Sequence, residues 1–412
     1  MKIAVVGSGI SGLVSAHLLS RRHDVVLLEA DARVGGHTHT FDVAEDGRNV
    51  PVDTGFIVFN ERTYPNFVKL LRQLDVAWKE SDMSFSVRSD RRDFEYGSPA
   101  LGALFAQKRN LVDPRFHRML YDIFRFYREA KDLLDEGSEV PLLEWLEARG
   151  YSRGFVEDHL LPLVGSVWSS SCQGVREFPA RFLARFFENH GFLEATRAFP
   201  WLTIEGGSRQ YVRAILDGFG GEVRTGSPVE RITRGDGVEV KAAGQAPERF
   251  DHAVLAVHAD QALRMLSDPS PLETELLGQF PYRANQVRLH ADDRVMPRRK
   301  KAWASWNYHL DDAGSDGATV TYWMNKLQGP KARRDYFVTL NREGAVADDR
   351  TLLEITYDHP VFSPSGVTAQ RRHGELLGHR GTSYCGAYWR NGFHEDGVVS
   401  ALSVCERFGE VL

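Results

Sequence analysis

A glycine-rich turn between an apolar strand and a helix constrains the fold of this chain more than any other feature. Residues 2–6 form a short apolar run, Gly7-Ser8-Gly9-Ile10-Ser11-Gly12 follows directly, and residues 13–20 have helical character. The first glycine permits the tight turn, the second lets the backbone approach a pyrophosphate, and the third lets helix and strand pack closely. The N–H groups at the helix start then face the phosphates. The pattern predicts a βαβ nucleotide-binding unit.

An acidic residue stands where such a unit needs one. A second apolar run, residues 25–28, ends on Glu29, twenty positions after Gly9. A carboxylate at this distance accepts hydrogen bonds from an adenosine ribose. The paired glycines Gly35-Gly36 follow in a loop, where glycine lets the backbone pass close to a bulky ligand. We expect an extended dinucleotide ligand here.

Length and composition narrow the class of protein. A chain of 412 residues is longer than one core usually serves, so two domains are expected. The formal net charge of -5 does not indicate nucleic acid as a partner. Cys172, Cys385 and Cys405 are widely spaced, so we expect no metal site and a cytoplasmic location. No signal peptide and no membrane-spanning helix are expected.

The order of predicted elements indicates an α/β fold with a second, α+β domain. A Rossmann-like domain is expected to be discontinuous, and its segments are residues 1–64, 201–270 and 371–412. The substrate domain, a mixed sheet with a helical, aromatic-rich insert, is expected over residues 65–200 and 271–370. Insert helices are predicted at residues 67–74, 115–134, 141–149 and 152–165. Strands are predicted at residues 221–225, 229–233, 238–241, 253–257, 284–292, 302–309, 318–325 and 351–357.

Three further motifs contain glycine turns. They are Asp53-Thr54-Gly55-Phe56, the segment 200–208 with Gly206-Gly207, and the segment 384–397. The last one ends a strand and starts a helix, with Asp396 expected as the N-cap residue. The positive end of such a helix stabilises negative charge on a bound ligand.

Together these motifs resemble the FAD-dependent amine oxidase superfamily, which includes monoamine oxidases, protoporphyrinogen oxidase and phytoene desaturases. The chain is most similar to a bacterial subgroup of FAD-binding proteins that are often encoded beside cyclopropane-fatty-acid synthases. The strings that carry the resemblance are GGHTHT (35–40), DTGF (53–56), WLTIEGGSRQY (201–211), TYWMNKLQ (321–328), VTLN (338–341) and YCGAYWRNGFHEDG (384–397).

The resemblance implies non-covalent FAD, because Cys385 does not match the cysteine that carries covalent flavin in some relatives. The cofactor residues that it implies are Gly7, Ser8, Gly9, Ile10, Ser11, Gly12, Glu29, Ala30, Arg33, Gly35, Gly36, His37, Thr38, Thr54, Gly55, Phe56, Val229, Gly386, Asp396, Gly397 and Val398. His37 stands where the superfamily usually has arginine. A histidine is largely neutral near pH 7, so compensation of the phosphate charge is expected to come partly from Arg33 or from elsewhere in the chain.

One departure concerns the reaction. Amine oxidases of this superfamily carry a lysine near flavin N5 on a substrate-domain strand. The comparable segment here, residues 283–289, has Asn285 or Gln286 near that position and no lysine. The difference favours electron transfer to another acceptor, or a redox-neutral use of the flavin, over oxygen-consuming amine oxidation.

Aromatic residues are the candidates for the substrate site. Trp168, Trp389 and Phe393, beside Tyr388, are expected to wall a pocket, with Gln286 facing the flavin. A dry aromatic pocket suits hydride transfer because it excludes water. The alternative is that these aromatic residues only pack in the core. His190, His359 and His394 are candidate bases, with a structural role as the alternative reading of each.

Two stretches mix basic and aromatic residues, as a lipid surface requires. They are residues 115–128 and residues 297–306. Such stretches suit anionic headgroups, so peripheral contact with the inner face of a membrane is a further hypothesis. The alternatives are a packed helix with a solvated face and a charged turn.

The leading functional hypothesis is an FAD-dependent oxidoreductase that takes a hydride from an apolar, fatty-acyl substrate to flavin N5, as a desaturase does. The lipid part rests on analogy with the subgroup. The alternative is a flavin amine oxidase that produces imine and hydrogen peroxide. A third hypothesis is a flavin-binding scaffold without turnover, and a sugar mutase lacks a supporting motif. The electron acceptor is left open.

Overall fold

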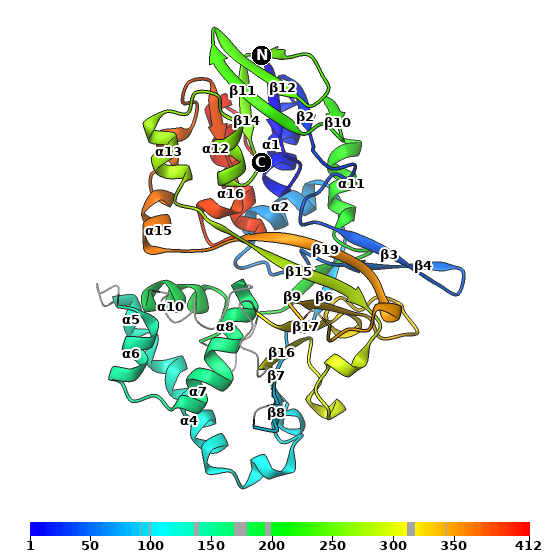
Figure 1. Cartoon of the computed structure of the whole chain (residues 1–412), viewed down its shortest axis with the longest axis vertical. Helices are drawn as coiled ribbons and strands as arrows, with labels where there is room; N and C mark the ends of the chain where they lie inside the picture. Colours follow the sequence, from blue (N-terminus) through cyan, green and yellow to red (C-terminus); the bar gives the residue numbers. More distant parts are fainter. Residues whose placement is uncertain are drawn as a thin grey trace.

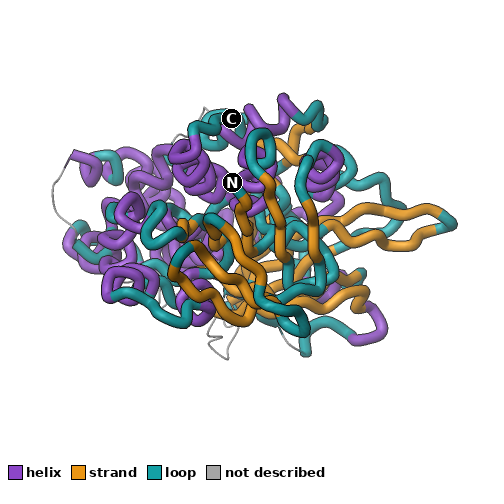
Figure 2. The backbone as a smooth tube through the Cα atoms, turned by 90° about the horizontal axis from the view of Figure 1, so that it is seen from above, coloured by secondary structure: helices purple, strands orange, loops and turns teal. Residues whose placement is uncertain are grey.

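The structure is a computed structural model that describes residues 1–90, 92–98, 100–135, 140–168, 179–193, 199–310, 318–342 and 344–412. Cys172 and the serines after Trp168 lie outside these residues. Figure 1 shows a sheet domain that carries both termini and a second domain with the helical insert, joined by long strands. Seen from above, the helices gather mainly on one side and the strands on the other (Figure 2).

A five-stranded parallel sheet forms the centre of the nucleotide-binding domain. Its strands, in spatial order, are β10 (Glu222–Arg224), β2 (Asp24–Leu28), β1 (Lys2–Val6), β14 (His252–Leu255) and β20 (Thr382–Tyr384). The side chains of β1 alternate between two apolar clusters, as burial on both faces of a parallel sheet requires. The predicted Rossmann-like domain is confirmed.

Helices cover one face of this sheet, and a small antiparallel sheet with two helices covers the other. The first layer contains α1 (Ile10–Leu19), α2 (Pro65–Gln73), α11 (Arg209–Asp217) and α16 (His394–Cys405). The second contains β11 (Val229–Gly235), β12 (Gly237–Ala242), β13 (Glu248–Phe250), α12 (Ala259–Met265) and α13 (Pro271–Leu277). α2 follows the predicted domain boundary at residue 64, yet its apolar face packs into the nucleotide-binding core.

A seven-stranded mixed sheet forms the substrate domain. Its spatial order is β19 (Thr351–Pro360), β15 (Tyr282–His290), β18 (Phe337–Leu340), β17 (Val320–Trp323), β16 (Trp306–Leu310), β7 (Phe85–Ser89) and β8 (Phe94–Ser98). No strand was predicted within residues 65–200, yet β7 and β8 lie there and extend the sheet. The strand predicted at 302–309 begins only at Trp306, since residues 300–302 form a 3-10 turn.

Smaller sheets connect the two domains. β3 (Thr40–Glu45) and β4 (Arg48–Asp53) form a hairpin that projects from the body (Figure 1). β9 (Trp201–Ile204) pairs with both β5 (Val58–Phe59) and β6 (Trp78–Ser81). The glycine turn that contains Gly55 therefore lies between the hairpin and this small sheet.

The insert packs its aromatic residues against the mixed sheet in one continuous core. Its helices are α3 (Leu101–Leu104), α4 (Pro114–Glu129), α5 (Asp132–Asp135), α6 (Leu142–Ala148), α7 (Arg153–Phe155), α8 (Leu161–Trp168) and α10 (Ala180–Asn189). Asp113 caps α4 by accepting the backbone N–H of Arg115 at 2.9 Å, with Pro114 at the first helical position as predicted. None of the described helices combines the length and apolar character needed to cross a bilayer.

Candidate functional site

A cavity of about 1080 Å³ lies where the nucleotide-binding sheet meets the mixed sheet. It opens at the carboxyl ends of β1, β2, β14 and β20, the edge at which open α/β sheets bind their ligands. Its other walls come from the insert and from β15 and β19. Ligand pockets usually measure about 300–1,000 Å³, so this one has room for a large cofactor and a substrate together.

The nucleotide end is built by the β1–α1 turn. Gly7 has a φ of +96°, and a Cβ there would lie 2.7 Å from the carbonyl oxygen of Ala256. A Cβ on Gly9 would meet nothing within 4 Å, so this position faces open cavity. Ile10 and Ser11 also line the cavity, at a helix end whose first N–H groups have no intrahelical acceptor. These features fit a pyrophosphate.

Glu29 connects this turn to the end of β2. Its carboxylate accepts the backbone N–H groups of Ser8 and Asp31, both at 2.9 Å. The Ser8 hydroxyl is a third donor to the same carboxylate. A carboxylate has about four acceptor positions, so Glu29 retains one for a ribose hydroxyl. The side chain lines the cavity, as the assignment to an adenosine ribose requires.

Arg33 supplies positive charge at this end. Its guanidinium donates to the carbonyl oxygens of Thr38 at 2.8 Å and Gly36 at 2.7 Å, which braces the glycine loop. Among the described residues no carboxylate forms an ion pair with Arg33, so its charge is available to a phosphate. Burial holds the pKa of His37 well below its usual value, so His37 is neutral. Its Nε2 is buried without a partner in the described structure, as expected of a group that awaits a ligand.

Most of the predicted cofactor residues line this cavity. They are Gly7, Ser8, Gly9, Ile10, Ser11, Glu29, Ala30, Arg33, Gly35, Gly36, His37, Thr54, Gly55, Phe56, Val229 and Gly386. The cavity lining does not include Gly12, Thr38, Asp396, Gly397 and Val398. A Cβ on Gly12 would collide with the carbonyl oxygen of Gly7 at 1.9 Å, so its place is the close helix–strand packing. A Cβ on Gly397 would lie 2.6 Å from the side chain of Ile10, so this glycine permits the close packing of α16 on α1.

The prediction of Asp396 as an N-cap residue was wrong. α16 begins at His394, and Asp396 is the third helical residue, whose carboxylate reaches back to the N–H of Phe393 at 2.9 Å. Burial raises the pKa of Asp396 to about 7. The Asp396 side chain therefore holds the backbone of Phe393, a residue that lines the cavity, at the start of α16.

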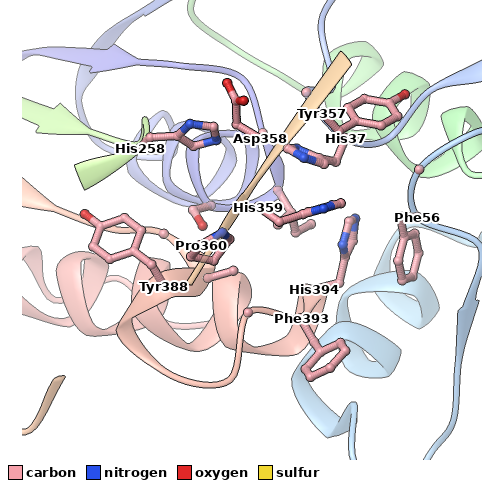
Figure 3. A pocket seen from close by; sticks show the side chains of 18 of the residues that line it. His37, Phe56, His258, Tyr357, Asp358, His359, Pro360, Tyr388, Phe393 and His394 are labelled. Carbon is pink, nitrogen blue, oxygen red and sulfur yellow. The ribbon is translucent and has the colours of Figure 1, made fainter. Parts of the chain in front are cut away.

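Four histidines surround the middle of the cavity: His37, His258, His359 and His394 (Figure 3). His37 stacks on Tyr357 with ring centroids 4.7 Å apart, and the ring of His359 lies 5.3 Å from it. Burial lowers the pKa of all four, to about 4 for His359 and about 3 for His394. The group is therefore uncharged near neutral pH.

Two of the candidate bases have structural partners. His394 stacks on Phe56 with centroids 3.5 Å apart, and its Nε2 lies 3.0 Å from the hydroxyls of both Thr38 and Tyr211. The Nδ1 of His190 lies 2.9 Å from the carbonyl oxygen of Phe186, and burial lowers its pKa to about 4. Both rings still reach the cavity.

The opposite end of the cavity is apolar, and we call it the aromatic end. It is lined by members of the core shared by the insert and the mixed sheet, which are Ile57, Val58, Met83, Val167, Trp168, Phe186, Phe192, Val287, Trp306, Tyr322, Leu340, Ile355, Tyr357, Phe362 and Phe393. Trp168 packs on Phe186 with centroids 4.4 Å apart, and Phe393 lies 5.2 Å from Phe186. Trp168 donates its Nε1–H to the carbonyl oxygen of Asn391 at 3.3 Å.

The described cavity lining also includes charged residues. They are Glu29, Asp31, Arg33, Glu230, Arg264 and Asp358. All except Asp358 come from the nucleotide-binding domain, and no lysine lines the described cavity. Among the described residues, no group of three or more His, Cys, Asp or Glu side chains is arranged to hold a metal ion.

Two predicted catalytic residues lie outside the cavity lining. Trp389 is buried, and its ring stacks on His373 with centroids 4.3 Å apart. Gln286 is exposed on the outer face of β15, where its side chain accepts the hydroxyl of Thr356 at 3.1 Å. Asn285, on the opposite face, is fully buried and bonded to His359 at 2.9 Å. The alternation of a strand assigns the polar role to Asn285.

A buried carboxylate that sequence reasoning missed joins four of the quoted strings. Asp53 accepts the backbone N–H of Ser208 at 3.0 Å, the hydroxyl of Thr40 at 2.5 Å and the Nε2–H of Gln328 at 3.1 Å. These residues come from DTGF, GGSRQY, GGHTHT and TYWMNKLQ. Asp53 therefore holds the loop whose next residues, Thr54 to Phe56, line the cavity. The sequence signal that could have indicated this contact is the presence of Asp53 and its partners in the strings that carry the family resemblance.

The fold and the cavity define a two-domain dinucleotide-binding protein with a second, apolar compartment. The family model of flavin-containing amine oxidoreductases matches residues 10–334, and the chain belongs to this family. Its predicted class, an FAD-dependent oxidoreductase, is confirmed at the level of that family.

A curated relative and two solved structures illustrate the likeness. The flavin-dependent L-tryptophan oxidase RebO of Lentzea aerocolonigenes is 27% identical over 294 residues, which is 64% of this chain and 56% of that protein. The chain thus spans little more than half the length of this relative. A CLA-producing fatty acid isomerase from P. acnes has a TM-score of 0.69 at 15% identity, with 98% of both chains covered. Cyclohexylamine oxidase from Brevibacterium oxydans IH-35A has a TM-score of 0.69 at 15% identity, with 99% of both chains covered.

Proposed function

We propose that this protein removes a hydride from a carbon of a fatty-acyl chain and transfers it to N5 of non-covalent FAD, as a desaturase does. The observation that carries the proposal is the set of apolar side chains that form the aromatic end, together with the absence of lysine from the cavity lining of the described residues. An acyl chain gains about 25 cal/mol for each Å² of apolar surface that leaves water. A charged substrate would lose hydration against these apolar side chains.

The residues of the chain divide the work between the two ends of the cavity. The β1–α1 turn, Glu29 and Arg33 hold the dinucleotide, and Trp168 and Phe393 exclude water from the reacting carbon. FAD supplies the hydride acceptor. Cys385 is buried beside Ser15, at 3.7 Å, and does not line the cavity, which supports a non-covalent cofactor. The adjacent carbon releases a proton as the double bond forms. Reoxidation passes the hydride's electron pair, with this proton and that of the hydride, to an external acceptor, so that dioxygen would give hydrogen peroxide and a quinone a quinol.

An amine oxidase is the second candidate. Aromatic faces attract cations, so the rings around the aromatic end are also compatible with an ammonium group. Cyclohexylamine oxidase and putrescine oxidase share the fold. Peroxide release with a panel of amines tests this candidate, and strong turnover there would overturn the fatty-acyl proposal.

A membrane-contact surface on α4 supports a lipid substrate. Tyr121 is 58% exposed and Phe124 63%. They share the outer face of the helix with Arg128, which is 78% exposed, and with Arg118, which pairs with Asp122 at 3.1 Å. Leu111 and Val112, just before α4, are 54% and 82% exposed. α4 lies at the end of the molecule remote from β1 (Figure 1). An exposed helix face that mixes rings and arginines fits an anionic lipid surface.

In the second stretch that the sequence indicated, residues 297–306, the basic and aromatic side chains make contacts within the protein. Arg298 pairs with Asp90 and Asp93, at 3.0 and 2.8 Å, and Arg299 with Glu95. Trp303 donates its Nε1–H to the carbonyl oxygen of Pro297 at 2.7 Å, and Trp306 lines the cavity. We therefore limit the membrane proposal to α4 and the residues before it.

A lipid comparison tests the function in cells. Lipids from cells with and without the protein are compared by mass spectrometry, with an Arg33→Gln variant as the matched control. We expect a fatty-acyl species that lacks two hydrogens in cells with the unchanged protein, less of it in cells with the variant, and none in cells without the protein. An identical acyl profile in all three would contradict the proposal.

A further inference from the structure

The histidine on β19 has a hydrogen-bond partner that determines where its proton lies. His359 lines the cavity, and its Nδ1 is 2.9 Å from the Nδ2 of Asn285 (Figure 3 shows the ring in the cavity). A neutral imidazole carries one proton, on Nδ1 or on Nε2. If Asn285 donates to Nδ1, the proton must be on Nε2, which has no partner among the described residues.

The orientation of a second amide, Asn341, is set by the backbone. The N–H of Gln286 donates to Oδ1 of Asn341 at 3.0 Å, and a backbone N–H accepts nothing. The other amide atom is therefore Nδ2, which donates to the carbonyl oxygen of Ala318 at 3.1 Å. Its remaining hydrogen bond, at 2.8 Å, runs to Oδ1 of Asn285.

The orientation of Asn285 follows from that of Asn341. With its oxygen toward Asn341, its Nδ2 donates to the carbonyl oxygen of Arg283 at 3.2 Å and to Nδ1 of His359. The flipped amide would set oxygen against that carbonyl and nitrogen against the nitrogen of Asn341. Asn285 is fully buried, where each unsatisfied polar group costs about 1–3 kcal/mol. The flipped state is therefore excluded.

The backbone at Asn341 is held in an uncommon conformation to make these contacts. Its φ is +52°, in the left-handed region that asparagine tolerates better than other residues with a Cβ. Strain of this kind persists where the surrounding structure requires it. Asn341 is the last residue of VTLN, a string that contributes no residue to the nucleotide end of the cavity.

We propose that Asn341 and Asn285 hold His359 as the neutral Nε2–H tautomer, so that it presents a hydrogen-bond donor to the cavity and does not act as a base there. Asn285 and Asn341 are positioning residues. The donor matches an uncharged acceptor, a carbonyl oxygen or an imine-type nitrogen, of the flavin or of the substrate. Only the identity of that acceptor rests on the proposed function; the tautomer does not.

Nitrogen NMR of the holoenzyme tests the tautomer. In ¹⁵N-histidine-labelled protein we expect His359 to show a pyridine-type Nδ1 and a pyrrole-type Nε2. Asn285→Asp replaces the donor with an acceptor and should move the proton to Nδ1. Asn341→Gly suits the positive φ, removes the second amide, and should give a mixture of tautomers. Gln286→Glu adds the same charge on the outer face and should leave the His359 signals unchanged.

Two outcomes would overturn the proposal. One is a protonated Nδ1 with a free Nε2 in the unchanged protein. The other is an Asn285→Asp variant that binds FAD and keeps the original His359 signals. Neither depends on any substrate, so failure of the proposed function would be seen separately.

Two further variants identify the acceptor. His359→Gln keeps a donor and His359→Leu removes it. If the acceptor is the flavin, His359→Leu shifts the visible absorption of the substrate-free holoenzyme and His359→Gln restores it. If the acceptor is the substrate, the spectrum is unchanged and the dissociation constant of a fatty-acyl ligand rises about tenfold in His359→Leu, the expected cost of one hydrogen bond. If His359→Leu changes neither the visible absorption nor the dissociation constant of the fatty-acyl ligand, the donor role of His359 is overturned.

Discussion

Asp53 accepts the backbone N–H of Ser208 with both carboxylate oxygens, at 3.0 Å each, although 155 residues separate the two in the chain. Ser208 also donates its hydroxyl to Asp53, at 2.8 Å. The contact ties the second glycine-pair turn to the loop of Thr54 and Gly55. A Cβ on Gly55 would lie 2.1 Å from the carbonyl oxygen of His37, so this loop must lie close to the glycine loop at the cofactor end.

The buried Asp53 predicts a pH dependence of stability. Burial raises its pKa from 3.8 to about 6. Between pH 4 and 6 the folded protein holds a proton that the unfolded chain has released, so the free energy of unfolding falls as pH rises. The expected fall is about 3 kcal/mol, from about 2 pKa units at 1.36 kcal/mol each.

Urea unfolding at saturating FAD measures this slope. Asp53→Asn removes the titrating group, so the difference between the two proteins should shrink as pH rises from 4 to 6. Burial also raises the pKa of Asp396, but this residue is present in both proteins, so its contribution to the pH dependence cancels in their difference. Parallel pH profiles would contradict the assignment.

The positive charge of Arg33 is expected to strengthen the binding of FAD. Arg33→Gln keeps donors for the loop carbonyls but removes the charge that faces the pyrophosphate. We expect the dissociation constant to rise about tenfold, near the lower end of the 1.5–3 kcal/mol range of a charged hydrogen bond. Titration of apoprotein with FAD checks this, with Arg72→Gln as an exposed control. Equal losses in both variants would argue against a specific role of Arg33.

The cofactor end was predictable because its determinants are local. Turn, helix start and ribose acid lie within residues 2–37, and their spacing alone implies their geometry. The aromatic end draws on α8, α10, β15 and β19, whose meeting depends on tertiary packing. The choice between Asn285 and Gln286 needed the strand register, because a shift of one residue exchanges the faces of a strand. Trp389, with the same local composition as its neighbours, gave no sequence signal that its ring turns into the core.

Trp168 lines the cavity and Trp389 does not, so we expect substitution of the first to affect substrate binding and substitution of the second to affect stability. Trp168→Phe enlarges the aromatic end, so KM for an acyl substrate should rise about tenfold, the effect of a small change in a hydrophobic pocket. Trp389→Phe should lower stability by about 1–3 kcal/mol and leave KM unchanged. Steady-state kinetics and urea unfolding of both variants measure this contrast. The reverse pattern would return Trp389 to the substrate site.

The outer face of α4 predicts binding to anionic vesicles. Replacing both Tyr121 and Phe124 with serine removes apolar surface that enters the interface, and should weaken vesicle binding at least about tenfold. Val223 and Leu352, which are 38% and 39% exposed, give a matched double serine control. Sedimentation with vesicles at low and high salt measures both. Equal binding by the two double variants would refute this surface.

The central claim is that the aromatic end takes an acyl chain and delivers hydride to FAD. Anaerobic mixing of the holoenzyme with fatty-acyl phospholipids or with amines, followed by visible absorption, tests it most directly. We predict bleaching of the flavin by the acyl lipids, lost or slowed in Trp168→Phe, and none by the amines. Rapid bleaching by an amine, with peroxide on admission of oxygen and no response to acyl lipids, would contradict the account.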